Sequence, residues 1–295
     1  MNAPIRVRCS LLRPVFFGLL FMLASTASIA EGLSDRPDPT LQARLEQAVE
    51  SLGLKSAAAD GNLSVALADV SDPDAPKLAL VNGHHMIYAA SLPKIAILLG
   101  AAVALEEGTL VMEPALERDL HEMIRVSCNA CATRVLDRVG RERLIEILQS
   151  PEYRFYDPQA GGGLWVGKPY GPESAYARDP LARLSHGATV FQVVRFYYRL
   201  HRRELVSPEQ SEMMLATLVD PGLPHKFVKG LAGIPDVTMY RKSGSWEHYH
   251  ADSALVVEED RSYIMVALAR DPNGGDWLAE LAPRLRGLIV TQDGH

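Results

Sequence analysis

A serine and a lysine three residues apart, Ser91 and Lys94, stand at the start of a strongly apolar stretch. If this stretch is helical, both side chains lie on one face of the helix. A serine hydroxyl becomes a good nucleophile when a nearby base takes its proton. A lysine shielded from water has a lowered pKa and can be that base. A helix N-terminus would also direct backbone N–H groups toward a developing oxyanion. The pair therefore suggests nucleophilic acyl transfer, and the alternative is a helix cap followed by a surface lysine.

Two further motifs follow along the chain. The segment Ser127–Asn129 reads Ser-Cys-Asn and lies where helices are predicted, and the segment Lys242–Gly244 reads Lys-Ser-Gly and lies in a predicted strand. In order and in secondary-structure context, the three motifs resemble those of class A β-lactamases and penicillin-binding D,D-peptidases. The resemblance extends over residues 38–290, which is most of the chain.

The resemblance implies a role for each residue of the first two motifs. Ser91 would be the acylated nucleophile, and Lys94 would be the partner that activates it. Ser127 would pass a proton toward the leaving amide nitrogen. Asn129 would orient Lys94 and would bind the side-chain amide of the substrate.

The third motif is implied to bind the substrate and to stabilise the transition state. Lys242 would supply positive charge for the substrate carboxylate, and Ser243 would be a hydrogen-bonding partner. The backbone N–H groups of Ser91 and Ser245 would form the oxyanion hole. Gly244 fits this arrangement, because a strand that a ligand approaches closely has no room for a side chain.

The segment of residues 150–188, which is rich in proline and glycine and is expected to form a long irregular loop, departs from the class A pattern. Class A β-lactamases carry Glu-x-x-Leu-Asn in this loop, and its glutamate activates the water that hydrolyses the acyl-enzyme. Glu152 and Glu173 are not followed by that pattern. The segment Arg154–Pro158 faintly resembles the Arg-x-Glu-Pro entry of the loop, so Asp157 is a candidate for a shorter substitute. Acylation is therefore expected, whereas fast hydrolysis of the acyl-enzyme is not implied.

The second motif also departs from the family. Its middle residue is Cys128, where the family normally has an aspartate, and Cys128 forms a Cys-x-x-Cys pattern with Cys131. A redox pair or a disulfide is one interpretation of this pattern. On a regular helix we instead expect two small buried thiols.

Other ligand-binding patterns are weak. His248 and His250 alternate on a strand next to Glu247, but no third histidine or cysteine accompanies them as a zinc site would require. The glycine-rich segment of residues 161–167 lacks the Gly-Lys-Ser/Thr ending of a phosphate-binding loop. We expect no metal ion and no cofactor.

The first thirty residues have the features of a secretory signal peptide. A basic stretch without acids precedes an apolar run at residues 14–24 and a small-residue segment that ends at Ala30. The apolar run is shorter than the about 20 residues that span a bilayer. We therefore expect cleavage after Ala30, a periplasmic or secreted protein of residues 31–295, and no membrane span after cleavage.

The remaining sequence is typical of a globular, acidic protein. Hydrophobic residues make up 47% of the chain and charged residues 22%, with a net charge of −6, which argues against disorder and gives no sign of a nucleic-acid partner. Helical spacing follows Asp38-Pro39, strands are expected at 62–70 and 78–81, helices at 91–140 and after Thr189 and Ser207, and strands at 237–242, 253–257 and 263–269. Asp276 would cap a last helix that is kinked or broken at Pro283.

This order of elements predicts an α+β fold. Strands from both ends of the chain would complete one antiparallel sheet, flanked by the N- and C-terminal helices. Residues 31–90 and 235–295 would form this α/β lobe, and residues 91–234 an inserted all-helical lobe, with the active site in the cleft between them.

Together these features predict an exported, monomeric serine hydrolase of the penicillin-recognising type. It would open β-lactam amides through an acyl-enzyme on Ser91. One alternative is a D,D-carboxypeptidase or esterase-like enzyme that deacylates β-lactams slowly. Another is a non-catalytic cell-wall-binding protein. In each case the expected partner is a small β-lactam or a cell-wall peptide.

Overall fold

The protein was studied as a computed structural model that describes Met1, residues 33–34 and residues 36–290. The chain divides into two units, residues 1–31 and 32–295, and the fold below is that of the second. Apart from Met1, the expected signal peptide lies outside the described residues. Within the described part of the chain, every helix is too short or too polar to cross a membrane.

A five-stranded antiparallel sheet forms the centre of the fold, in the order β2-β1-β10-β9-β8. Its strands are β1 (Leu63–Asp69), β2 (Lys77–Val81), β8 (Thr238–Trp246), β9 (Tyr249–Val257) and β10 (Ser262–Arg270). Strand β1 pairs directly with β10, so the sheet is completed from both ends of the chain, as the sequence predicts. Strand β8 lies at one edge of the sheet.

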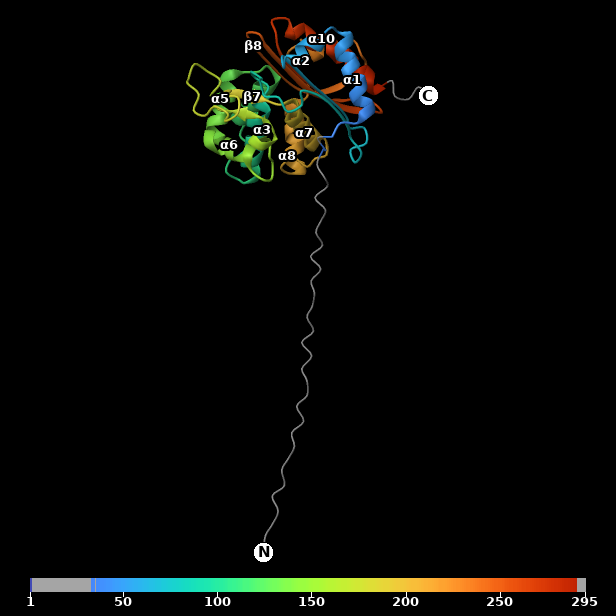
Figure 1. The fold of residues 1–295 in the computed structure, drawn as a ribbon. Coiled ribbons are helices and arrows are strands. Elements are labelled where there is room, and N and C mark those ends of the chain that lie inside the picture. The colour runs from blue at the N-terminus through green and yellow to red at the C-terminus, as the bar shows by residue number, and fades with distance from the viewer. Residues whose placement is uncertain (2–32, 35, 291–295) are drawn as a thin grey trace. The chain divides into compact units, whose positions relative to one another are not determined.

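The sheet is buried on both faces. Successive side chains of a strand point to opposite faces, and β1 accordingly sends Leu63, Val65 and Leu67 into one core and Ala66 and Ala68 into another. The first core lies under α1 (Pro39–Ser51), α9 (Phe227–Gly230) and α10 (Gly274–Val290). Figure 1 shows α1 and α10 side by side over this face.

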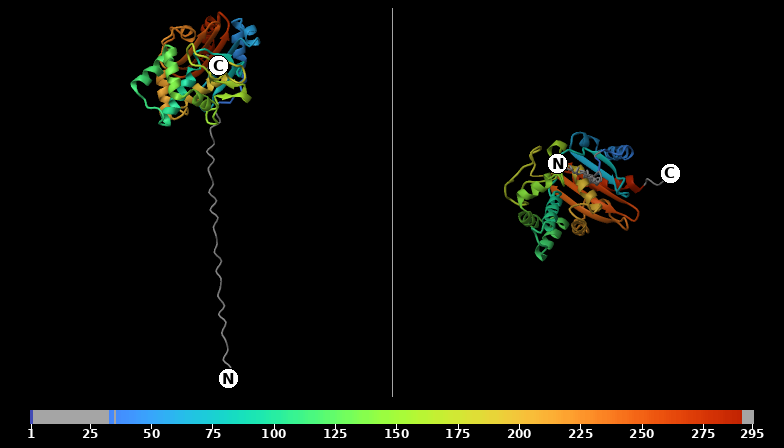
Figure 2. Two further views of the ribbon diagram at one scale, coloured as in Figure 1. Left: turned by 90° about the vertical axis from the view of Figure 1, so that its left-hand side faces the viewer. Right: turned by 90° about the horizontal axis from the view of Figure 1, so that it is seen from below.

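The second face of the sheet packs against α7 and the helical block. These helices are α3 (Lys94–Glu106), α4 (Pro114–Arg125), α5 (Asn129–Val139), α6 (Arg141–Gln149), α7 (Val190–His201) and α8 (Pro208–Leu218), and a short helix α2 (Lys55–Ala59) precedes β1. Helix α3 is buried from Lys94 to Ala104, because it is apolar on every side. Figure 2 shows the helices of residues 94–149, in green, beside the sheet.

Three predicted helix starts are confirmed. The side chains of Asp38, Thr189 and Ser207 each accept a hydrogen bond from the backbone N–H three residues later, which satisfies a donor that the first turn leaves open. One prediction for the last helix is wrong, because the helix begins at Gly274, so Asp276 lies in its first turn and does not cap it. The helix continues through Pro283, so it is not broken there.

The last helix is closely packed at its proline. Proline has no N–H, so the carbonyl of Ala279 loses its helical partner at Pro283. Gly230 of α9 lies directly against that carbonyl, and a Cβ atom at Gly230 would be 2.2 Å from the Ala279 oxygen. A glycine at position 230 therefore allows α9 to pack closely against α10 beside its proline.

The segment expected as an irregular loop, residues 150–188, contains short strands. They are β4 (Tyr156–Asp157), β5 (Gly162–Gly163), β6 (Trp165–Val166) and β7 (His186–Ala188), with a 3₁₀ turn at Pro158–Ala160. β7 pairs with both β6 and β3 (Ile87–Tyr88), just before Ser91. This pairing brings the segment to the side of the predicted nucleophile.

Candidate active site

Ser91 lies in a tight turn that leads into α3. The N–H of Lys94 donates to the carbonyl of Ser91 at 3.2 Å. The sequence predicts a helix that begins at Ser91, but the regular helix begins three residues later, at Lys94. The preceding residue, Ala90, has a φ of +50°, which is uncommon for a residue with a side chain. The turn leaves Ser91 half-buried, while Leu92 and Lys94 are buried.

Lys94 is buried and held by the second motif. Its Nζ atom donates to the carbonyl of Ser127 at 2.6 Å and to Oδ1 of Asn129 at 2.7 Å. Burial lowers the pKa of Lys94 to about 7, and within the described chain no carboxylate offsets this shift. The amine can therefore lose its proton near neutral pH, as a general base must.

Ser127 joins the first motif to the third. Its hydroxyl oxygen lies 3.4 Å from Lys94 Nζ and accepts a hydrogen bond from Lys242 Nζ at 3.0 Å. Burial, and secondly the nearby Lys94, hold the pKa of Lys242 well below its usual value. Ser127 itself has a φ of +62°, so the backbone at this position is locally constrained. One hydroxyl thus lies between two buried amines.

Gly244 brings the edge strand β8 against the turn of the nucleophile. A Cβ atom at this position would lie 2.3 Å from the carbonyl oxygen of Ala89 and 2.7 Å from the backbone nitrogen of Ser91. Only glycine allows this approach. The structure thus brings the segments Lys242–Ser245 and Ser91–Lys94 together, as the motifs predict.

Lys226 supports the same strand end and was not predicted. Its buried ammonium donates to the carbonyl of Gly244, to Oγ of Ser245 at 2.8 Å and to the carbonyl of Ala251 at 3.0 Å. Burial lowers the pKa of Lys226 to about 8. A single lysine in a loop carries no spacing pattern, so the sequence offers no signal for this contact.

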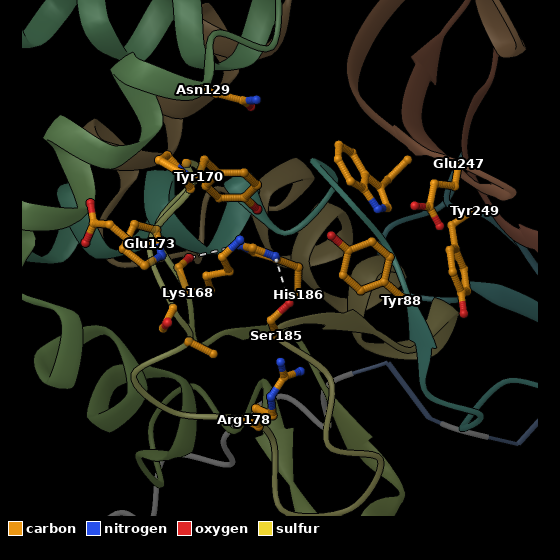
Figure 3. Close-up of a pocket in the computed structure, with 16 residues that line it drawn as sticks. Tyr88, Asn129, Lys168, Tyr170, Glu173, Arg178, Ser185, His186, Glu247 and Tyr249 are labelled. Atoms are coloured by element: carbon orange, nitrogen blue, oxygen red, sulfur yellow. Dashed lines mark hydrogen bonds between the residues drawn. The ribbon is translucent and has the colours of Figure 1, made fainter.

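A cavity of about 830 Å³ is lined in part by Asn129 of the second motif. Figure 3 shows Asn129 at its edge, with Lys168 and Glu173 on one side and Tyr88, Glu247 and Tyr249 on the other. Tyr88 and Tyr249 pack edge to face at 5.1 Å. The cavity therefore offers both aromatic surface and charge next to Asn129, as a site for the side chain of a small ligand requires.

Tyr170 occupies the space next to Lys94. Its ring centre lies 4.5 Å from Lys94 Nζ, its hydroxyl donates to the carbonyl of Ala90 at 3.2 Å, and it packs on the ring of His186 at 4.2 Å. Burial lowers the pKa of His186 to about 4, so this imidazole is neutral at neutral pH. The loop that carries Tyr170 is closed at Gly167, whose carbonyl accepts from the N–H groups of Tyr176 and Ala177.

The structure does not bring Asp157 to the site. Its carboxylate pairs with Arg154 at 2.8 Å, accepts from the N–H of Gln159 at 2.9 Å and lines a different cavity with Arg195. Glu173 does line the cavity beside Asn129, but it is exposed and pairs with Arg141 at 3.2 Å. The expectation that Asp157 replaces the water-activating glutamate is not supported by this placement.

Cys128 and Cys131 form a disulfide, so the expectation of two thiols is wrong. Cys128 is the N-cap of α5 and not part of its regular turns, so its side chain folds back over the first turn, where its sulfur accepts from the N–H of Cys131 at 3.1 Å. With Glu122 the two cysteines are the one group of possible metal ligands found among the described residues, but the disulfide engages both sulfurs. His248 packs on Tyr249 instead.

Known structures with the same fold come from two kinds of protein. The TM-score is 0.64 to the β-lactamase of Sphaerobacter thermophilus, at 16% identity over 85% of this chain and 99% of that one. It is 0.65 to a class A β-lactamase representative from Bacteroides cellulosilyticus, at 16% identity over 88% of this chain and 100% of that one. It is 0.62 to PBP-A, at 18% identity over 86% of this chain and 97% of that one.

At these identities the solved structures establish a shared fold. No protein with a curated description matches the chain. The model of the β-lactamase enzyme family, however, matches residues 114–286, which is more than half of the sequence and includes the second and third motifs. The chain therefore belongs to the β-lactamase enzyme family.

Proposed function

We propose that this β-lactamase-like hydrolase is exported and acts through an acyl-enzyme on Ser91. Its substrates would be β-lactams or cell-wall peptides that end in D-Ala-D-Ala. The observation that carries the proposal is the buried amine of Lys94, which donates to Ser127 and Asn129 and has a pKa lowered to about 7 by burial. An amine of this kind can take the proton of a neighbouring serine at neutral pH.

In the proposed acylation, neutral Lys94 accepts the hydroxyl proton as Ser91 attacks the substrate carbonyl. The oxyanion is bound by the backbone N–H groups of Ser91 and Ser245, and removing one such donor costs about 10²–10³ in rate in other enzymes. The hydroxyl of Ser127 then gives a proton to the leaving nitrogen. Its contact with Lys242 at 3.0 Å and its 3.4 Å distance from Lys94 allow it to be reprotonated.

Substrate binding would use the third motif and the cavity. Lys242 and Ser243 would bind the substrate carboxylate, Asn129 the side-chain amide, and the 830 Å³ cavity the side chain beyond it. A mutant of PBP-A has been solved as an acyl-enzyme complex with penicillin-G, and its structure has a TM-score of 0.63 to this chain. A protein with the same fold can therefore form the kind of adduct that we propose.

Deacylation separates two candidate activities. In a fast β-lactamase a carboxylate activates the water, but here the ring of Tyr170 lies next to Lys94 and Asp157 lies in another cavity. We propose that the penicilloyl-enzyme is hydrolysed slowly. This favours a D,D-carboxypeptidase or esterase-like reaction as the natural activity over rapid β-lactam turnover.

Intact-mass measurement with a fluorescent penicillin and a chromogenic cephalosporin tests the proposal. We expect a covalent adduct on the wild-type protein that persists over many minutes, and none on Ser91→Ala. Ser56→Ala, at an exposed position of α2 outside this cavity, is the matched control and should be acylated like the wild type. Binding without an adduct would identify a non-catalytic wall-binding protein, and rapid turnover would identify a β-lactamase.

A further inference from the structure

The disulfide lies between two residues of the candidate site. Cys128 is flanked by Ser127 and Asn129, and its bond to Cys131 joins the start of α5 to the first turn of the same helix. The N–H of Cys128 also donates to the carbonyl of Glu122 at 3.0 Å, which ties this corner to the end of α4. The backbone between Ser127 and Asn129 is thus fixed at its centre by a covalent bond.

The same corner supplies three of the contacts that hold the two buried amines. Lys94 donates to the Ser127 carbonyl and to Asn129 Oδ1, and Lys242 donates to the Ser127 hydroxyl. A rotation of the backbone at Cys128 would move all three acceptors together. Displacements of about 1 Å in such constellations cost about a hundredfold in rate.

The surroundings of the disulfide allow it to be opened. Cys128 is half-buried, whereas Cys131 is 1% exposed, so a small dithiol reaches the sulfur of Cys128 first. The sulfur released would be that of Cys131. It lies 3.4 Å from the guanidinium of Arg134, which favours a leaving thiolate. It also lies 3.3 Å from a carboxylate oxygen of Glu122, which opposes the thiolate but can accept a hydrogen bond from the protonated thiol.

We propose that the Cys128–Cys131 disulfide positions Ser127 and Asn129 for acylation, and that a dithiol reductant slows acylation by opening it. The dithiol supplies two electrons and two protons. The protein disulfide becomes two thiols, and the dithiol becomes a cyclic disulfide. The inference rests on the acyl-enzyme mechanism proposed above. The two cysteines act as positioning residues and need not touch the substrate.

The test compares the second-order rate of acylation by a fluorescent penicillin in the oxidised, dithiol-reduced and reoxidised protein. Alkylation followed by peptide mass measurement establishes the state of Cys128 and Cys131 in each sample. We expect the rate to fall about ten- to a hundredfold on reduction and to recover on reoxidation. The midpoint of thermal unfolding should change little, because the loop that the bond closes is short.

A double variant, Cys128→Asp with Cys131→Ala, should restore the acylation rate of the oxidised protein without a disulfide. Aspartate is a good N-cap, so it can accept the backbone N–H of residue 131 without sulfur, and the dithiol should not change its acylation rate. Cys131→Ala alone should react as slowly as the reduced wild type.

Three results would overturn the inference. They are equal rates for the reduced and oxidised protein, a Cys131→Ala variant as fast as the oxidised protein, or a fall in rate matched by a fall in folded fraction. No acylation in any redox state would instead overturn the proposed function.

Discussion

At the scale of single residues, the proposed mechanism predicts that the protonation state of Lys94 sets the pH dependence of acylation. Only the neutral amine can accept the proton of Ser91, and burial lowers its pKa to about 7. The second-order rate of acylation is therefore expected to be low at pH 5, to reach half its maximum near pH 7 and to level off above pH 8. Rates with a fluorescent penicillin across this range measure the profile.

A matched variant sharpens this prediction. Lys94→Arg keeps a positive charge but cannot deprotonate in this range, so acylation should fall about 10²–10⁴-fold at every pH. A rate that is independent of pH from 5 to 9 in the wild type would contradict the assignment of Lys94 as the base.

Tyr170 is the residue that we expect to limit deacylation. Tyr170→Glu would place a carboxylate next to Lys94, where it could activate water, so turnover of a chromogenic cephalosporin should rise at least about tenfold. The new charge should also raise the pKa of Lys94 and move the acylation profile to higher pH. Tyr170→Gln, which has a similar shape and no charge, is the control. An equal gain in both variants would mean that space for water, and not a base, was missing.

The sequence predicts these residues unequally. Lys94, Ser127 and Asn129 belong to short motifs, and the structure brings them into contact, with Ser91 in the turn that leads to Lys94. The approach of Tyr170 to Lys94 depends on how the whole loop between β6 and β7 folds, which no local pattern encodes. The sequence favours two thiols over a disulfide because it places Cys128 in a regular helix, whereas Cys128 is the N-cap.

At the scale of elements, we expect the contact between β8 and the Ser91 turn to determine the rate of acylation. Gly244→Ala would place a Cβ atom 2.3 Å from the Ala89 oxygen and 2.7 Å from the Ser91 nitrogen, so the strand must move away. We expect acylation to fall about a hundredfold while the circular dichroism spectrum stays the same. Gly287→Ala in α10, where a Cβ atom meets nothing within 4 Å, should leave the rate unchanged. Wild-type rates in Gly244→Ala would show that the strand can yield without cost.

The elements themselves were predicted with different success. Long elements carry many residues at a regular spacing, so α1, α7, α8 and the strands β1, β9 and β10 lie close to their expected positions. The two-residue strands of residues 150–188 carry no such repeat. β4 and β5 pair with each other, whereas β7 pairs with β6 and with the distant β3, which is a tertiary contact.

At the scale of the whole molecule, the ion pair of Arg241 and Asp252 joins the sheet to the segment before α9. The two side chains are 2% and 0% exposed, Asp252 also accepts from the N–H of Phe227 at 3.0 Å, and Arg241 donates to the carbonyl of Leu223 at 2.9 Å. Arg241→Met leaves a buried carboxylate without its partner, so the free energy of unfolding should fall by about 3–5 kcal/mol.

Urea unfolding followed by circular dichroism measures this effect. The control is Lys55→Met, which breaks a solvent-exposed pair with Glu50 and should leave the urea midpoint unchanged. If both variants unfold at the wild-type midpoint, the buried pair does not stabilise the fold.

The α+β class is predictable from the sequence. Strands at the two ends of the chain can pair into one sheet, and the helices between and beside them can cover both faces of that sheet.

The pairing of β1 with β10 also determines when activity can arise during synthesis. Ser71 and Ser262 are hydrogen-bonded although 191 residues separate them. Ser91 and Lys242 also lie far apart in the sequence, so the proposed nucleophile is synthesised long before the proposed carboxylate-binding strand. The edge of β1 stays open until the last strand emerges. Contacts this distant in sequence form slowly, so we expect the proposed site to be complete only when the final strand has paired.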